Sequence, residues 1–371
     1  MGKSKVFFTD MRTGTSVTLP QKFEKLLRKA GIGDIDFQNK FVAIKTHFGE
    51  LGNLAYLRPN YARTVAELVK SLGGKPFLTD CNTLYVGSRK NALEHMDAAY
   101  INGFSPFSTG CYILIGDGLK GTDDVEVPVE GGQYVKNAKI GRAIMDADVV
   151  ISLSHFKGHE AAGFGGALKN LGMGCGSRAG KMEMHCDGKP RVNREDCIGC
   201  GMCTKVCAQD AITITDKKAS IDHDRCVGCG RCIGVCHQDA VVPPYDESND
   251  IMNCKIAEYA KAVVDGRPCF HISLVVDVSP FCDCHAENDA PIVPDVGMFA
   301  SFDPVALDKA CVDAVNAQPV IRDSLLGEAE AHGRDGDYFH AVSPETNWRS
   351  CLEHAEKIGV GTMDYELVTV K

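Results

Sequence analysis

Eight cysteines in the middle of the chain are spaced as ligands of iron. They form two copies of the pattern C-x2-C-x2-C-x3-C. The first three thiolates of a copy can face three corners of one cubane, whereas the fourth points away and ligates the other cluster. The pattern therefore predicts two 4Fe-4S clusters with crossed ligand sets. The sets are Cys197, Cys200, Cys203 and Cys236, and Cys207, Cys226, Cys229 and Cys232.

The alternative interpretation of this array is a pair of structural zinc sites. Zinc sites take their four ligands as two pairs, whereas each copy here is a triplet plus one, so the spacing favours iron-sulfur clusters. Residues 211–225, between the two copies, are expected to form a hairpin that relates the two halves. Residues 190–242 resemble the bacterial two-cluster ferredoxins, except that Ala208 and His237 replace the proline that usually follows the fourth cysteine.

A second set of reactive side chains follows apolar runs elsewhere in the chain. Imidazoles titrate near neutral pH, and lysines beside them would add positive charge, which predicts proton transfer or substrate binding. The alternative is that each histidine is a structural, hydrogen-bonded residue. The candidate catalytic residues are Lys45, His47, His155, His159 and Lys169.

The glycine-rich stretch at 163–174 could bind an anion. Glycines between a strand and a helix can bring backbone N–H groups close to a negative group, and nearby basic side chains would add charge. The stretch is not a G-x-G-x-x-G motif, which argues against a dinucleotide, and the glycines could instead permit tight packing of the helix. The candidate anion-binding residues are Lys157, Gly165, Gly166, Asn170 and Arg178.

Cys282 and Cys284 are separated by one residue, so on an extended chain both side chains face the same way. Together with Cys175 or Cys186 and a histidine, they could hold a third iron-sulfur cluster or a single metal ion, because soft thiolates select such metals. The alternative is that all four are free thiols in a reducing compartment.

The elements that must position these residues alternate along the chain. Short apolar runs typical of strands occur at 6–10, 41–49, 75–81, 111–117, 148–156 and 269–279. Helical spacing of apolar residues occurs at 59–74, 88–104, 303–317 and 348–359. This alternation predicts an α/β fold, a mainly parallel sheet with helices on both faces.

The pattern is interrupted by the cysteine array and then resumes. We therefore expect a discontinuous α/β domain of residues 1–186 plus 249–371, and a small α+β domain of the two-cluster ferredoxin kind at 187–248. The final part of the chain is too short to build a core alone, which favours one discontinuous domain over two separate ones.

Composition narrows the function classes. The 371 residues carry a net charge of −9 with no block of Lys or Arg, which argues against a nucleic-acid partner. The sequence contains no run of about 18 apolar residues, so no membrane span is expected, and no secretion signal precedes the first expected strand. Eighteen cysteines without such a signal indicate metal binding in a reducing cytoplasm and suggest anaerobic life.

The chain resembles the family called domain of unknown function 362, in versions that carry a two-cluster ferredoxin module. The resemblance implies a ferredoxin attached to an α/β domain and a redox role, without a substrate. It rests on KTHFGE, TDCNTLYVGSR, SHFKGHEAAGFGGALKNLGMGCGSRAGK, the CDC at 282–284 and FASFDPVALDKAC.

These observations predict an oxidoreductase in which two clusters exchange electrons between a soluble donor or acceptor protein and a basic pocket that binds a small anionic substrate. Two alternatives remain at this point: a non-catalytic electron carrier or adaptor that docks a partner enzyme, and a protein that handles metals or clusters.

Overall fold

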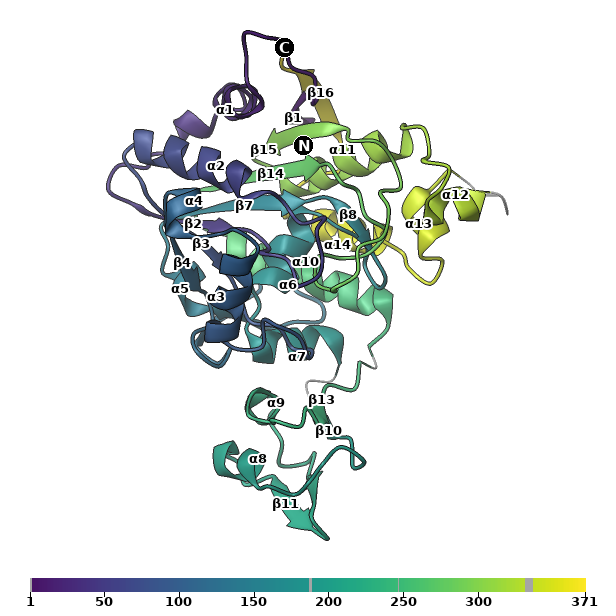
Figure 1. Ribbon diagram of the computed structural model, residues 1–371. Helices are drawn as coiled ribbons and strands as arrows, with labels where there is room; N and C mark the ends of the chain where they lie inside the picture. Colours follow the sequence, from purple (N-terminus) through teal and green to yellow (C-terminus); the bar gives the residue numbers. More distant parts are fainter. Residues whose placement is uncertain (1, 187–188, 246, 331–335) are drawn as a thin grey trace.

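An eight-stranded sheet forms the centre of the larger part of the molecule (Figure 1). The computed structural model describes residues 2–186, 189–245, 247–330 and 336–371. All neighbouring strands run parallel except where β15 lies between β14 and β1, so the predicted mainly parallel sheet is confirmed. The strand order is β16 (Tyr365–Thr369), β1 (Ser4–Thr9), β15 (Gly297–Ser301), β14 (Cys269–Val275), β7 (Val149–His155), β2 (Phe41–Lys45), β3 (Lys75–Asp80) and β4 (Tyr112–Ile115).

Helices cover both faces of this sheet, and an apolar core lies under each layer. One core is built with α1 (Leu19–Lys29), α2 (Pro59–Ser71) and α3 (Ala92–Ile101), with α4 (Pro106–Thr109) beside α2. The other is built with α5 (Arg142–Met145), α6 (Ala167–Cys175), α7 (Arg178–His185), α10 (Asn249–Val264), α11 (Pro304–Asn316), α12 (Leu325–Glu330), α13 (Tyr338–Val342) and α14 (Arg349–Lys357).

Burial on both faces explains why the central strands read as continuous apolar runs. In β7, Val149 and Ile151 belong to one core and Val150 to the other. The helix ends follow their local signals: α2 starts at Pro59, and Asp303 caps α11 by accepting from two backbone N–H groups. Two hairpins complete this part, β5 (Asp124–Pro128) with β6 (Asn137–Gly141), and β8 (Lys157–His159) with β9 (Gly163–Gly165).

Residues 189–245 form a separate cysteine-rich lobe, seen at the bottom of Figure 1. It has a small apolar cluster, to which Leu84, Met182 and Cys186 of the large part also belong, and two short antiparallel strand pairs. Its elements are β10 (Arg191–Val192), α8 (Met202–Val206), β11 (Ile212–Thr215), β12 (Lys218–Ile221), α9 (Arg231–Gly234) and β13 (Val241–Val242). The pair β11 and β12 forms the hairpin expected between the two cysteine copies.

The two halves of this lobe repeat one another in backbone geometry. Gly199 and Gly228 occupy equivalent positions in the two cysteine loops, with φ of 68° and 69°. A side chain is strained at such angles, and a Cβ on Gly199 would lie 2.5 Å from the Lys217 backbone. The duplication in the sequence therefore appears as a duplicated loop conformation.

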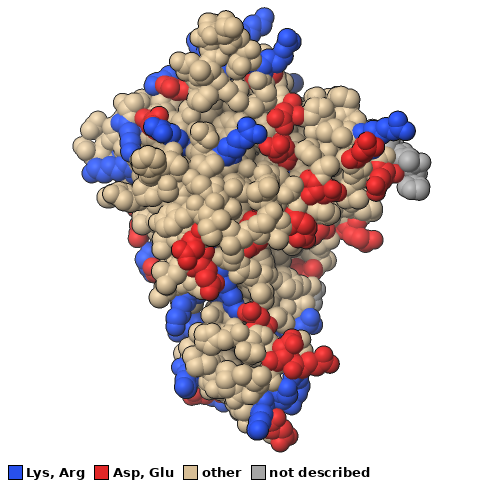
Figure 2. Space-filling view, viewed as in Figure 1, with Lys and Arg blue, Asp and Glu red and all other residues tan. Residues whose placement is uncertain are grey.

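The lobe contacts the large part through α7 and the loop after β3. Arg178 lies against Gly230 and Gly234, and Lys90 Nζ donates to the carbonyl oxygen of Cys236 at 3.2 Å. Figure 2 shows the lobe protruding from the larger body, with basic and acidic side chains interspersed on the face in view. Among the described residues, no helix is both long and apolar enough to span a bilayer.

Candidate functional site

A cavity of about 490 Å³ lies where four neighbouring parallel strands end. Because β14, β7, β2 and β3 are parallel, the loops after their carboxyl ends meet at one edge of the sheet, which is where open α/β folds bind ligands. Eleven residues predicted from the sequence line this cavity: Lys45, His47, His155, Lys157, His159, Gly165, Gly166, Lys169, Asn170, Cys282 and Cys284.

Lys45 is held by buried partners at one side of the cavity. Its Nζ lies 2.9 Å from an Asp80 carboxylate oxygen and donates to Asn170 Oδ1 at 2.7 Å. Burial alone would raise the pKa of Asp80, but the charge of Lys45 and the neighbouring histidines hold it well below its ordinary value. Lys45 and Asn170 therefore position one another and the end of β2.

His47 lies beside a buried arginine. Arg89 donates to Glu50 at 3.0 Å, and its Nη1 lies 2.8 Å from His47 Nε2. Burial and the charge of Arg89 both lower the pKa of His47 well below its ordinary value. His47 is consequently a neutral group at physiological pH.

His155 has a partner on each ring nitrogen. Its Nδ1 lies 2.8 Å from Asp283, and its Nε2 donates to the carbonyl oxygen of Val276 at 2.8 Å. Burial would raise the pKa of Asp283, but the charges of His155 and Lys157 outweigh it and lower that pKa. Both nitrogens of His155 are thus used inside the protein, which makes it a positioning residue for the loop that carries Asp283.

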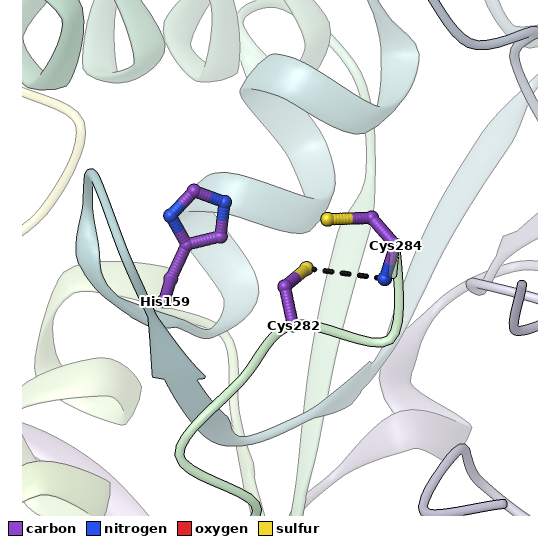
Figure 3. Close-up of side chains that lie close together, drawn as sticks. All are labelled: His159, Cys282 and Cys284. Carbon is purple, nitrogen blue, oxygen red and sulfur yellow. Dashed lines mark hydrogen bonds between the residues drawn. The ribbon is translucent and has the colours of Figure 1, made fainter. Parts of the chain in front are cut away.

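Cys282 and Cys284 meet His159 at the wall of the cavity, as Figure 3 shows. The two sulfurs and a ring nitrogen of His159 lie within 4.8 Å of one another, a spacing that could hold a metal ion. A second group of the same kind, Glu160, Cys284 and His285, shares one of these thiols. The structure therefore presents a candidate metal-binding group in the cavity.

The protonation of these two thiols is unequal. Burial alone would raise the pKa of Cys282, but a hydrogen bond from the Cys284 thiol, the charges of Lys169 and Lys157, and His159 together hold it well below its ordinary value. The pKa of Cys284 is raised because its thiol donates to the Cys282 sulfur and is partly buried. Lys169 Nζ lies 3.6 Å from the Cys282 sulfur. The lowered pKa of Cys282 favours its thiolate form, and the Lys169 ammonium group faces this sulfur.

The glycine-rich stretch does not present its N–H groups to the cavity as an anion site. The first backbone N–H groups of α6, at Ala167 and Leu168, donate to the Asp308 carboxylate at 2.7 and 2.9 Å. Gly166 leaves room for that carboxylate, since a Cβ there would lie 2.3 Å from Asp308 Oδ1. The protein's own side chain thus occupies the helix N-terminus, and the packing alternative describes these glycines.

Three predicted residues do not line the cavity. Cys175 and Cys186 are buried and lie outside the described group around Cys282, which contains the expected histidine, His159, but neither of these cysteines. Arg178 donates to the carbonyl oxygens of Lys120 and Lys90 and contacts the cysteine-rich lobe. It was expected to bind an anion because it follows the glycine-rich stretch, but α7 turns it toward the lobe.

The sequence reasoning missed Asp283 and Asp308. Asp283 lies between the two cysteines on the loop after β14, and its place between two candidate ligands was a usable signal. Asp308 lies 140 residues beyond the helix it caps, so no local pattern could have revealed it.

The eight array cysteines line two cavities in the lobe. Both cavities use three consecutive cysteines of one copy and the fourth cysteine of the other. One is lined by Cys197, Cys200, Cys203 and Cys236, and the other by Cys207, Cys226, Cys229 and Cys232. Backbone N–H groups donate to sulfur in both, from Ala219 to Cys197 and from Ala211 to Cys207, each at 3.3 Å. Four inward thiols with N–H donors fit a cubane cluster.

Comparison with known proteins gives a family and distant structural likenesses. A thylakoid-associated protein of Synechocystis sp. is 30% identical over 149 residues, which are 38% of this chain and 40% of that relative. The chain thus spans less than half of that relative's length.

Two solved structures align at low identity. The lactate racemase apoprotein from Thermoanaerobacterium thermosaccharolyticum is 13% identical, with a TM-score of 0.41 over 98% of this chain and 88% of that one. A Thermotoga maritima protein is 12% identical, with a TM-score of 0.38 over 71% and 52%.

The family model described as "Domain of unknown function (DUF362)" matches residues 42–313, which include both the cavity residues and the cysteine array. Since this match covers well over half of the chain, the protein belongs to the DUF362 family.

Proposed function

We propose that this protein is an iron-sulfur oxidoreductase that holds two 4Fe-4S clusters in its cysteine-rich lobe. The observation that carries the proposal is the partition of eight cysteines between two cavities, each lined by one crossed set. When bound, such clusters supply single electrons at potentials set by nearby hydrogen bonds and charges. We also propose that residues 187–248 are an inserted two-cluster ferredoxin domain within the discontinuous α/β domain.

The two cysteine sets differ in their surroundings, which supports an order between them. Cys200 of the first set is exposed, whereas the cysteines of the second set are intermediate or buried, so the first set is the more accessible to a soluble donor or acceptor protein. The loop of the second set contacts Arg178 through Gly230 and Gly234. Leu84 packs with the lobe's apolar cluster and also lines the cavity, so this side chain lies between the two.

The cavity residues support chemistry on a small anionic substrate. Lys157 and Lys169 supply positive charge at the cavity wall. His159 is the histidine of the set that faces the thiols, so it can hold a proton there, whereas His155 and Lys45 position the loops. Cys282 and Cys284 complete the wall, with their sulfurs facing His159.

Iron and acid-labile sulfide analysis of anaerobically purified protein tests the cluster proposal. We expect about eight iron and eight sulfide per chain, from four of each per cluster. A Cys229→Ser variant should lose roughly half of the iron, while the Cys254→Ser control, outside the array, should keep it. One or two zinc ions per chain without sulfide would contradict the proposal.

Reoxidation of the reduced protein tests for an enzyme. Anionic small molecules would be added to the anaerobically reduced protein, and the recovery of the visible absorbance of the oxidised clusters would be followed. We expect at least one compound to reoxidise the protein with saturation, and a Lys157→Met variant to weaken that saturation. Reoxidation by proteins alone, with no small-molecule saturation, would instead support the electron-carrier alternative.

A further inference from the structure

The thiols of Cys282 and Cys284 lie in a setting built for sulfur chemistry. Cys282 is 1% exposed and sits on the loop after β14, while Cys284 is partly exposed toward the cavity. The backbone N–H of Cys284 donates to the Cys282 sulfur at 3.4 Å, which fixes the short loop (Figure 3). Gly158 lets β8 approach this loop closely, because a Cβ there would lie 2.2 Å from the Pro280 carbonyl oxygen.

His159 is oriented as a hydrogen-bond donor toward these sulfurs. Its Nδ1 accepts from the backbone N–H groups of Ala161 and Ala162 at 3.1 and 3.0 Å. A nitrogen that accepts carries no proton, so the ring proton lies on Nε2, the nitrogen that points toward the sulfurs in Figure 3. Metal-binding imidazoles have the opposite arrangement, with a bare nitrogen toward the ion and a proton on the other.

Positive charge next to the sulfur also argues against a metal ion at this site. Lys169 Nζ lies 3.6 Å from the Cys282 sulfur, where a metal cation would be repelled but a thiolate is stabilised. Two thiols away from the cavity contrast with Cys282, because burial raises the pKa of Cys254 to about 11 and that of Cys269 to about 12. The two cysteines therefore form a thiolate and thiol pair within reach of one another.

We propose that Cys282 and Cys284 are a redox-active dithiol that interconverts with an intramolecular disulfide in the cavity. For its source of electrons in the cell, this proposal rests on the proposed electron-transfer function. It assigns the cavity a two-electron acceptor built from the protein's own side chains.

The reaction balances with two electrons and one proton. On reduction by a one-electron donor protein acting twice, the bond between the two sulfurs breaks. The Cys282 sulfur leaves as a thiolate beside Lys169, and the Cys284 sulfur takes one proton. On oxidation, two electrons and that proton are lost and the bond forms again. Cys282 is the better leaving and attacking sulfur because its charge is stabilised.

Thiol trapping of the full-length protein tests the couple. Anaerobic samples would be equilibrated in dithiothreitol buffers of defined potential, quenched in acid, alkylated with N-ethylmaleimide and digested. Mass spectrometry would then follow the peptide that carries both cysteines. We expect the two alkylations to appear together along one two-electron curve. Alkylation of both cysteines at every potential would overturn the proposal.

The pH dependence of the midpoint potential reports the proton count. A tenfold change in proton concentration changes a one-proton equilibrium tenfold, which is about 30 mV for a two-electron couple. We expect that slope near neutral pH. A slope twice as large would show that Cys282 is protonated on reduction and would overturn its assignment as the thiolate.

Lysine variants test the role of charge. Lys169→Met should lower the midpoint potential because it removes the charge that stabilises the reduced thiolate. Lys169→Arg should keep it, and the exposed Lys136→Met should leave it unchanged. Equal lowering by Lys169→Met and Lys169→Arg would overturn the charge assignment.

Metal analysis of the same samples separates this proposal from the proposed function. About eight iron per chain with no disulfide would overturn the dithiol proposal and support the cluster proposal. A reversible disulfide in protein without iron would support the dithiol proposal and overturn the cluster proposal. A further metal ion that is bound by the wild type and lost in Cys282→Ser would favour the metal-site alternative and overturn the dithiol.

Discussion

Arg178 joins the two parts of the molecule at the level of a single side chain. It is fully buried, and its Nε and Nη2 donate to the carbonyl oxygens of Lys120 and Lys90. Its Nη1 is buried and has no hydrogen-bond partner among the described residues. Because the side chain packs on Gly230 and Gly234, beside Cys232, its charge lies next to the second cysteine set.

That charge leads to a prediction for the proposed clusters. A nearby cation favours the more negative, reduced form, so Arg178→Gln should lower the reduction potential of one cluster. A spectroscopic redox titration of the full-length protein would measure the shift, with the exposed Arg142→Gln as the control. An unchanged potential in a variant that keeps its iron would contradict the prediction.

His271 makes the stability of the protein depend on pH. The residue is buried in β14, its Nδ1 lies 2.9 Å from Ser152 Oγ, and burial lowers its pKa from 6.5 to about 3. Between these values the unfolded chain binds a proton that the folded protein does not. The contribution of His271 to the free energy of unfolding is therefore fully present above pH 6.5 and is lost as the pH falls toward 3.

We expect a His271→Asn variant to show a shallower decline over this range. The reduction in slope should reach at most about 1.4 kcal/mol per pH unit, the value for one proton. Chemical denaturation at several pH values would measure the slopes, and the exposed His340→Gln serves as the control. Identical slopes for wild type and His271→Asn would refute this account.

At the scale of elements, α6 and α10 approach so closely that a glycine is required between them. A Cβ on Gly172 would lie 2.2 Å from the backbone carbonyl oxygen of Ile256. This contact holds the helix that carries Lys169 and Asn170 at a fixed distance from the core.

Gly172→Ala should therefore destabilise the protein, although alanine is the better helix former. We expect a loss of about 1–3 kcal/mol from overpacking. Gly33→Ala is a matched control, since a Cβ at Gly33 meets no atom within 4 Å, and it should be neutral or slightly stabilising. Denaturant melts of both variants would decide, and equal stability of the two would disprove the packing argument.

The sequence predicts those helices and strands whose buried residues form a regular apolar pattern. The central strands β2, β3 and β7 are apolar on both faces and were expected within a few residues. The hairpin β5 and β6 was missed because its strands are partly exposed and mixed in polarity. The strand β15 was missed because it is short and contains glycine and serine.

The same reasoning explains the site. Residues directly after parallel strands could be expected to meet at one edge, and most of the predicted ones line the cavity. Partners joined only by the tertiary fold, such as Asp308 at α6 or His159 at the thiols, have no local signature. The position of Arg178 depends on the orientation of α7, and the spacing of apolar residues in the sequence does not predict that orientation.

At the scale of the whole molecule, the two parts differ greatly in how they are held together. The large part has two apolar cores, one on each face of an eight-stranded sheet. The described lobe has one small cluster, to which several of its cysteines belong, and its helices α8 and α9 are single turns. A region of this size with so small an apolar cluster is marginally stable on its own, so bound metal would add much of its stability.

Removal of iron with a chelator should therefore unfold the lobe and spare the sheet. Hydrogen exchange read by mass spectrometry should show lost protection within 189–245 and retained protection in β7 and β14. Uniform protection throughout would show that the lobe folds without metal. Global loss of protection would show that the two parts unfold as one unit.

The segment that leaves the lobe also builds a wall of the cavity. Tyr245, Glu247 and Asn249 line it, and the Tyr245 ring contacts His185 with centroids 5.3 Å apart. Glu247 also pairs with Lys255 of α10. The chain must therefore finish the lobe before this wall is in place. If the lobe holds the proposed clusters, completion of the cavity depends on iron supply, and a newly made chain starved of iron would have a complete sheet but an incomplete chamber.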